Sequence, residues 1–281
     1  MIRILLLLVL LAVTGSPVSF ARAENLDAAK AGREAQARGE VDEAIRLYTE
    51  AIETGSLGPE NLAIVHNNRG IAYWSKGDFD KALVDYSAAI KLRPDYVAAY
   101  DNRGVVYRDL GQTDKEIADF NEAIGLNADD AFAYENRGRA RLHTGQVKEA
   151  IADLGRAVAL DPTDSYAVLW LHLARTFAGQ DDALEFARNA QTLDAKHWPA
   201  PIIDLYLGLA TPEKVRTAAL VGDARTQKIQ TCEANFYVGA FQLLHGAKEQ
   251  AKPLFEAAAK GCPPTYLEAE AAKAQLKRLE R

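Results

Sequence analysis

The 281-residue sequence is poor in the residue types that most often carry chemistry, with two cysteines, one methionine and five scattered histidines. No histidine has a second histidine or a cysteine at ligand spacing, which argues against a metal centre. The sequence also lacks Gly-x-Ser-x-Gly and any glycine-rich loop after a strand, which excludes the familiar hydrolase and nucleotide-binding patterns. We therefore expect a protein that is not an enzyme and has no cofactor.

Positive charge is not in excess. Lysine and arginine number 33 against 39 aspartates and glutamates, so the formal net charge is −6. A chain of this charge has no general attraction to nucleic acid or anionic lipid. Runs of β-branched residues are few and alanine is frequent, which favours helix. The composition predicts an all-α protein with no nucleic-acid partner.

Only one stretch is continuously apolar, Ile4 to Val13. Arg3 precedes it, and Ala21-Arg22-Ala23 supplies small residues for cleavage, as in a secretory signal peptide. The alternative is a membrane anchor, but ten residues are too few to span a bilayer, which needs roughly 20. We expect residues 1–23 to be removed after Ala23, which would leave a net charge of −8. No cysteine near this site could carry lipid, and the mature chain would not insert into a membrane. The expected location is the periplasm or the medium.

A period of 34 residues dominates the rest of the sequence. Its kernel is Asn-Arg-Gly, and small and aromatic residues follow at fixed offsets from Ala63, Val97 and Ala131. This period and pattern are typical of the tetratricopeptide repeat (TPR), a pair of antiparallel helices that stacks on its neighbours. The sequence thus predicts an all-α right-handed superhelix, an α-solenoid, with a C-terminal capping helix.

The array has regular and irregular parts. We expect about five TPR units in 24–194, an irregular helical insert in 195–231, a last repeat in 232–264 and the capping helix in 265–281. Pro59 after Gly58 predicts an early helix start in the second unit. Glu116 stands where the neighbouring repeats have Ala82 and Ala150, so we expect its carboxylate to reach solvent or a partner.

The kernel arginines Arg69, Arg103 and Arg137 are each followed sixteen residues later by an aspartate. We interpret these residues as ion pairs between the two helices of one unit, with the aliphatic part of each arginine packed in the hairpin. The alternative is a row of ligand-binding cations.

The kernel asparagines suggest a binding groove, because this position faces the concave side of a TPR superhelix and an amide can bind a peptide backbone. The alternative is that asparagine simply faces water. Lysine is absent one residue before each asparagine, which disfavours a clamp for C-terminal carboxylates. The candidate groove residues are Asn68, Asn102, Asn136, Ile71, Trp74, Arg108, Phe132 and Arg139.

The two cysteines, Cys232 and Cys262, flank the last repeat, with Cys232 expected to open its first helix. An antiparallel hairpin brings these ends together, and an exported protein favours a disulfide. The alternative is two reduced, buried thiols.

The stretch Glu233-Ala-Asn-Phe-Tyr-Val-Gly239, with Gly246, Ala251, Leu254, Phe255 and Ala258, resembles the closing repeat of the new lipoprotein I family. Ile202 to Gly208 is similar to the helix that precedes that repeat. The family consists of TPR adaptors of the Gram-negative envelope. The resemblance implies a homodimer that brings a C-terminal-processing protease to substrates such as peptidoglycan endopeptidases. The lipobox cysteine of the family is missing, so its membrane anchor does not carry over.

Together these features predict an exported TPR scaffold that binds protein or peptide partners in its concave groove. Through the resemblance, it would link a periplasmic protease to cell-wall enzymes. An alternative is a periplasmic assembly factor, or a chaperone-like protein that holds extended peptides. A third alternative is an enzyme with an unrecognised site in 195–231.

Overall fold

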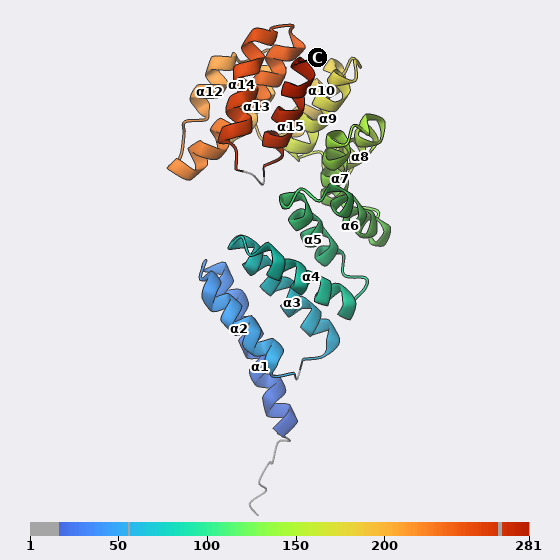
Figure 1. Cartoon of the computed structure of the whole chain (residues 1–281), viewed down its shortest axis with the longest axis vertical. Helices are drawn as coiled ribbons and strands as arrows, with labels where there is room; N and C mark the ends of the chain where they lie inside the picture. Colours follow the sequence, from blue (N-terminus) through green and yellow to red (C-terminus); the bar gives the residue numbers. More distant parts are fainter. Residues whose placement is uncertain (1–16, 56, 264–265, 281) are drawn as a thin grey trace, which may run out of the picture. The chain divides into compact units, whose positions relative to one another are not determined.

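The computed structural model describes residues 17–55, 57–263 and 266–280 (Figure 1). Every regular element in these ranges is a helix, as predicted. The chain divides into two compact units, one up to Ala99 and one from Tyr100 onward. The boundary falls within α5 (Val97–Asp109). We describe each unit separately.

The first unit consists of two helical hairpins. Its helices are α1 (Pro17–Ala37), α2 (Val41–Glu53), α3 (Pro59–Ser75) and α4 (Phe79–Leu92). Helix α3 has Pro59 as its first residue and is four residues longer than α5, which confirms the predicted early start. Most of the expected signal peptide, residues 1–16, lies outside the described residues. Ala23, the expected cleavage position, lies within α1.

The second unit begins with two more regular hairpins and then becomes irregular. After α5 come α6 (Thr113–Leu126), α7 (Ala131–His143), α8 (Val147–Leu160), α9 (Ser165–Phe177), α10 (Ala183–Asn189), η1 (Ala190–Thr192), α11 (Ala200–Tyr206), α12 (Pro212–Ala218), α13 (Ala224–Leu244), α14 (Lys248–Gly261) and α15 (Leu267–Leu279).

The kernel glycine is needed because a large side chain from the second helix lies directly on it. A Cβ atom on Gly70 would be 2.7 Å from the Tyr86 ring, and one on Gly138 would be 2.9 Å from Leu154 Cγ. Real Cβ atoms do not approach other atoms so closely. The turn glycines have a different role: Gly77 and Gly145 both have φ +79°, a conformation that side chains disfavour.

The predicted arginine–aspartate pairs are confirmed in all three regular hairpins. Each is bidentate: Arg69 Nε and Nη2 both donate to Asp85 at 2.8 Å, and Arg103 donates in the same way to Asp119 at 2.8 and 2.7 Å. Arg137 donates to Asp153 at 2.8 and 2.6 Å. Burial acts to raise the pKa of Asp85, but the hydrogen bonds from Arg69 and His66 outweigh it and lower that pKa. The kernel arginine therefore has an architectural role.

The fifth TPR repeat departs from the pattern at His172, which stands where the regular repeats have glycine. Its second helix, α10, has only seven residues. The ring of Phe186 lies 4.3 Å from the His172 ring, centroid to centroid, and Tyr206 of α11 packs edge-on against it at 5.2 Å. The imidazole is held by these two rings and by a hydrogen bond between its Nδ1 and Asp182 Oδ2 at 2.9 Å.

The last repeat begins earlier than expected. Helix α13 starts at Ala224, so Cys232 lies in its third turn and does not open it, and the insert is shorter than 195–231. Asp223 caps this helix by accepting a hydrogen bond from Thr226 N. The expected disulfide is present, joining Cys232 of α13 to Cys262 after α14, with the Cα atoms 4.9 Å apart.

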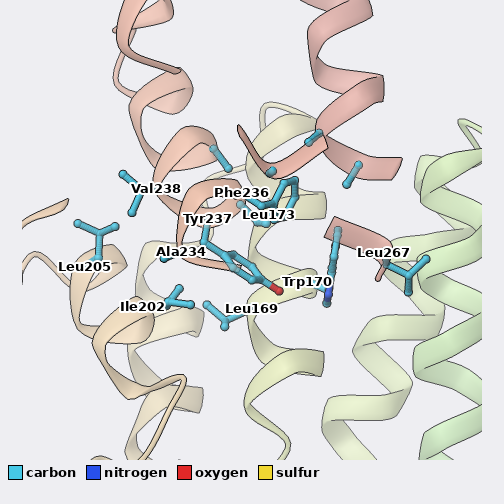
Figure 2. Close-up of a cluster of buried hydrophobic side chains, with 14 of the residues drawn as sticks. Leu169, Trp170, Leu173, Ile202, Leu205, Ala234, Phe236, Tyr237, Val238 and Leu267 are labelled. Atoms are coloured by element: carbon cyan, nitrogen blue, oxygen red, sulfur yellow. The ribbon is translucent and has the colours of Figure 1, made fainter. Parts of the chain in front are cut away.

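The largest hydrophobic core lies in the second unit, in the region from α8 to α15. Figure 2 shows its centre, where Trp170 of α9 and Phe236 of α13 stack with centroids 5.4 Å apart. Leu267 brings α15 into the same cluster. Helix α15 is thus part of the core as well as the end cap that we predicted. Two of its polar residues, Glu268 and Gln275, are buried together with its alanines. Within the described residues, no helix is both long and apolar enough to cross a membrane.

Candidate functional site

The candidate site lies on the face of the second unit formed by the first helices of its repeats. On α7, four side chains recur at steps of four, three and four residues and therefore form one stripe: Phe132, Asn136, Arg139 and His143. Phe132 is 48% exposed at one end of the stripe, whereas Asn136 is only 2% exposed. The stripe passes from an exposed aromatic ring to buried polar groups.

Asn136 is engaged within the chain. Its Nδ2 donates to the carbonyl of Phe132 at 2.9 Å, and its Oδ1 accepts from Arg108 Nη1 of α5 at 3.1 Å. An amide has two N–H groups and two lone pairs, so one of each remains for another partner. Two of the predicted groove residues, Arg108 and Asn136, therefore contact each other, which joins α5 to α7.

Arg139 is the centre of a buried charge network. Its Nη1 donates to Glu135 Oε1 at 2.8 Å, its Nη2 lies 4.0 Å from Glu268 Oε1 of α15, and its Cζ lies 5.2 Å from the Trp170 ring centroid. Burial opposes the charged form, but Glu135 and Glu268 raise the pKa of Arg139. Its Nε has no hydrogen-bond partner. The guanidinium thus remains charged and retains one unused donor.

Glu116 does not reach solvent, contrary to our expectation. It is 2% exposed, and its Oε1 is buried without a hydrogen-bond partner. Burial raises its pKa to about 7, and the charges of Arg108 and Arg139 only partly offset this effect. The repeat packs around the longer side chain, since two cations nearby make a buried carboxyl tolerable.

Two further acids in the second unit have raised pKa values. Burial and the carboxyl of Asp130 raise the pKa of Asp101 to about 7, and Asp101 Oδ1 is buried without a partner. Burial and Glu268 raise the pKa of Glu233 to about 7, although Trp198 and Tyr166 both donate hydrogen bonds to it. This part of the unit therefore concentrates buried carboxyl groups around few cations.

A cavity of about 260 Å³ adjoins this network. Its walls come from α7, α9, α13 and α15 and from the start of α8, and they are mostly apolar, with the Trp170 and Phe236 rings among them. The lining residues with polar side chains are His143, Gln275 and Arg278, besides the Trp170 indole. Burial and the Arg139 charge lower the pKa of His143 to about 4, so this imidazole is neutral at pH 7.

The other predicted groove residues are distributed over both units. In the first unit, Asn68 and Ile71 are half-buried on α3, and Trp74 is 37% exposed near the end of that helix. In the second unit, Asn102 is half-buried on α5. A role of these residues in binding a peptide stays a prediction.

Several residues of the site were not predicted. Glu116 was noticed as an irregularity in the repeat, but its burial was not expected. Glu268 was missed because it lies in the expected capping helix. Trp170 was missed because it occupies the asparagine position of the fifth TPR repeat. No group of three or more histidine, cysteine, aspartate or glutamate side chains suited to a metal ion occurs among the described residues.

Comparisons with known proteins identify the repeats. The tetratricopeptide repeat pattern matches residues 63–96, 97–130 and 131–164, with the period that the sequence indicated. A 53-residue segment, 19% of the chain, is 43% identical to the DnaJ homolog subfamily C member 7 homolog of Schizosaccharomyces pombe. The aligned segment spans 11% of that protein.

Solved structures match the fold. A crystal structure of a tetratricopeptide repeat protein from Parabacteroides merdae covers 93% of this chain and 100% of its own, with 18% identity and a TM-score of 0.61. MamA from Desulfovibrio magneticus covers 63% of this chain and 96% of its own, with 22% identity and a TM-score of 0.52. The chain thus contains three recognisable tetratricopeptide repeats and has an α-solenoid fold.

Proposed function

We propose that the chain is an exported scaffold that binds an extended segment of a protein partner along the first-helix face of its repeats. The observation that carries this proposal is unused hydrogen-bonding capacity in the second unit, on the first helices α5 and α7 and on the adjacent α6. Asp101 Oδ1, Glu116 Oε1 and Arg139 Nε are buried and have no partner within the chain. Buried polar groups are nearly always paired, so a partner segment that reaches these atoms would supply donors to the two carboxyl oxygens and an acceptor to Arg139 Nε.

The exposed Phe132 ring supports the same face. In protein interfaces a few residues carry most of the binding energy, and large aromatic side chains are frequent among them. The excess of carboxyl groups favours a segment that brings N–H donors or a basic side chain. Within the second unit, the amide of Asn102 would add contacts.

The finer parts of the proposal rest on the sequence. Cleavage after Ala23 would release the chain into the periplasm or the medium. The likeness to the new lipoprotein I family suggests a homodimer that links a periplasmic protease to cell-wall enzymes. The alternative, an assembly factor or a holder of extended peptides, uses the same face with less selectivity.

Site-specific photocrosslinking separates these possibilities. A photoreactive phenylalanine analogue at Phe132 should capture one or two defined periplasmic proteins if the chain is an adaptor, and many if it holds unfolded peptides. Leu184 on α10, which is 85% exposed, is the matched control for a random surface position. If both positions capture the same proteins equally well, the first-helix face is not the binding surface.

A further inference from the structure

The cavity between α7, α9, α13 and α15 is large enough for a ligand and is not accounted for by peptide binding. An apolar cavity of about 150 Å³ already holds a benzene ring. The volume here is about 260 Å³, and most of the lining side chains are apolar, among them Leu142, Leu173, Phe177 and Ala274. In proportion to benzene, this space fits an apolar group of about ten carbons.

The deep wall of the cavity is rigid and contains an unused donor. Trp170 is 4% exposed and stacks on Phe236, so neither ring can easily move to fill the space. The indole Nε1 of Trp170 is buried and has no hydrogen-bond partner. The space beside these fixed rings therefore remains open to a ligand.

The polar groups of the cavity favour an anion. Arg278, an exposed residue of α15, is the charged side chain in the lining, and Gln275 lies one turn before it. No ion pair of Arg278 occurs among the described residues. His143, the remaining polar lining residue, is neutral at pH 7 because burial and Arg139 lower its pKa. One guanidinium beside an apolar space complements a carboxylate attached to an apolar chain.

We propose that this cavity binds the anion of a medium-chain fatty acid of about eight to ten carbons. The acyl chain would lie against Trp170 and Phe236, and the carboxylate would pair with Arg278. The Arg278 charge would repel an amphiphile with a cationic head, and a neutral alcohol could not form the ion pair. The site is separate from peptide binding at Phe132, so either proposal can fail without the other.

The test is tryptophan quenching by 10-bromodecanoate, below its micelle concentration. Bromine quenches indole fluorescence on contact, so we expect saturable quenching that decanoate reverses and decyltrimethylammonium does not. Trp170→Phe should abolish the saturable component, because Trp74 and Trp198 do not line the cavity. Quenching that persists in Trp170→Phe, or that the cationic amphiphile reverses equally well, would overturn the proposal.

Two substitutions on α15 locate the ligand. Arg278→Gln should weaken binding roughly tenfold, because a charge-assisted hydrogen bond is lost. Lys277→Gln removes a neighbouring exposed cation that does not line the cavity, and it should leave the affinity unchanged. Ala274→Phe should block binding by filling the space, with folding checked by circular dichroism. Equal affinities of Arg278→Gln, Lys277→Gln and the unmodified chain would contradict the assigned carboxylate site.

Discussion

The regular hairpin α5–α6 and the final hairpin α13–α14 have the same glycine contact but different neighbours around it. In α5–α6, Arg103 precedes Gly104 and pairs with Asp119. In α13–α14, Val238 precedes Gly239, and Leu254 takes the place of the aspartate. A Cβ atom on Gly239 would lie 3.1 Å from Phe255 and 3.3 Å from Leu254 Cβ, so the helices are as close there as in a regular repeat.

This comparison shows that the glycine and the large side chain over it define the hairpin. The two side chains next to them can form either an ion pair or an apolar pair. The hairpin α1–α2 supports this conclusion. Ala31 and Leu47 occupy the positions of the ion pair there, and Tyr48 lies on Gly32. A buried ion pair gains little over a well-packed apolar pair, since desolvation offsets the attraction. The final hairpin has its disulfide in addition.

The largest effect is expected when one member of an ion pair is removed. Asp119→Ala deprives Arg103 of a bidentate acceptor and should cost about 3 kcal/mol of unfolding free energy. The double variant Arg103→Val with Asp119→Leu, which copies α13–α14, should lie within about 1 kcal/mol of the unmodified chain. Urea unfolding of the three proteins measures this, with Asp129→Ala at an exposed pair as the control. A double variant as unstable as the single one would contradict the conclusion that an apolar pair can replace the ion pair.

Loss of the disulfide should have an effect of comparable size. Cys232 and Cys262 are 30 residues apart, and closing a loop of this length stabilises the native state by between about 3 and 4 kcal/mol. Cys232→Ser with Cys262→Ser should therefore lower the urea midpoint of the second unit, and reductant should have no further effect on this variant. An unchanged midpoint would mean that apolar packing alone supports the final hairpin.

The glycine contact should have a smaller effect, of about 2 kcal/mol. Gly138→Ala places a Cβ atom 2.9 Å from Leu154 Cγ and 3.3 Å from the Ala150 carbonyl, so the two helices must separate. Gly155 lies in the same hairpin with no atom within 4 Å of its Cβ position, and Gly155→Ala should stabilise α8 by about 0.5 kcal/mol. The midpoint of thermal unfolding should thus fall in Gly138→Ala and rise in Gly155→Ala. Shifts of the same sign would contradict the role of the kernel glycine.

The last effect concerns pH. Glu116 has a pKa of about 7 in the folded chain against the ordinary 4.5, so between these values the unfolded chain binds fewer protons. Its contribution to stability is therefore complete below about pH 4.5, falls as the pH rises and is level above about pH 7. Asp85, with its lowered pKa, acts in the opposite sense and loses its contribution in acid.

Glu116→Gln isolates this contribution. The variant should lose less stability than the unmodified chain between pH 5 and pH 8, as measured by urea midpoints. Glu149→Gln, at an exposed site on α8, is the matched control and should follow the unmodified chain. An identical pH dependence in Glu116→Gln would show that its carboxyl titrates normally.

The sequence by itself determined the repeats, their turns and the ion pairs. These features follow from local rules: a 34-residue period, glycine at helix ends, and charges sixteen residues apart that an antiparallel hairpin must bring together. The disulfide was predictable for the same reason, because the two helices of one hairpin place Cys232 and Cys262 near each other.

Only the tertiary structure decided where α13 begins, how α15 packs and what surrounds Glu116. The burial of Glu268 and the cavity beside Trp170 arise because α15 contacts helices distant in sequence, which no repeat pattern encodes. The environment of Glu116 depends in the same way on Arg108 and Arg139, which belong to two different helices. Periodicity specifies contacts within a hairpin, whereas the irregular end of the array is shaped by packing between helices of different repeats.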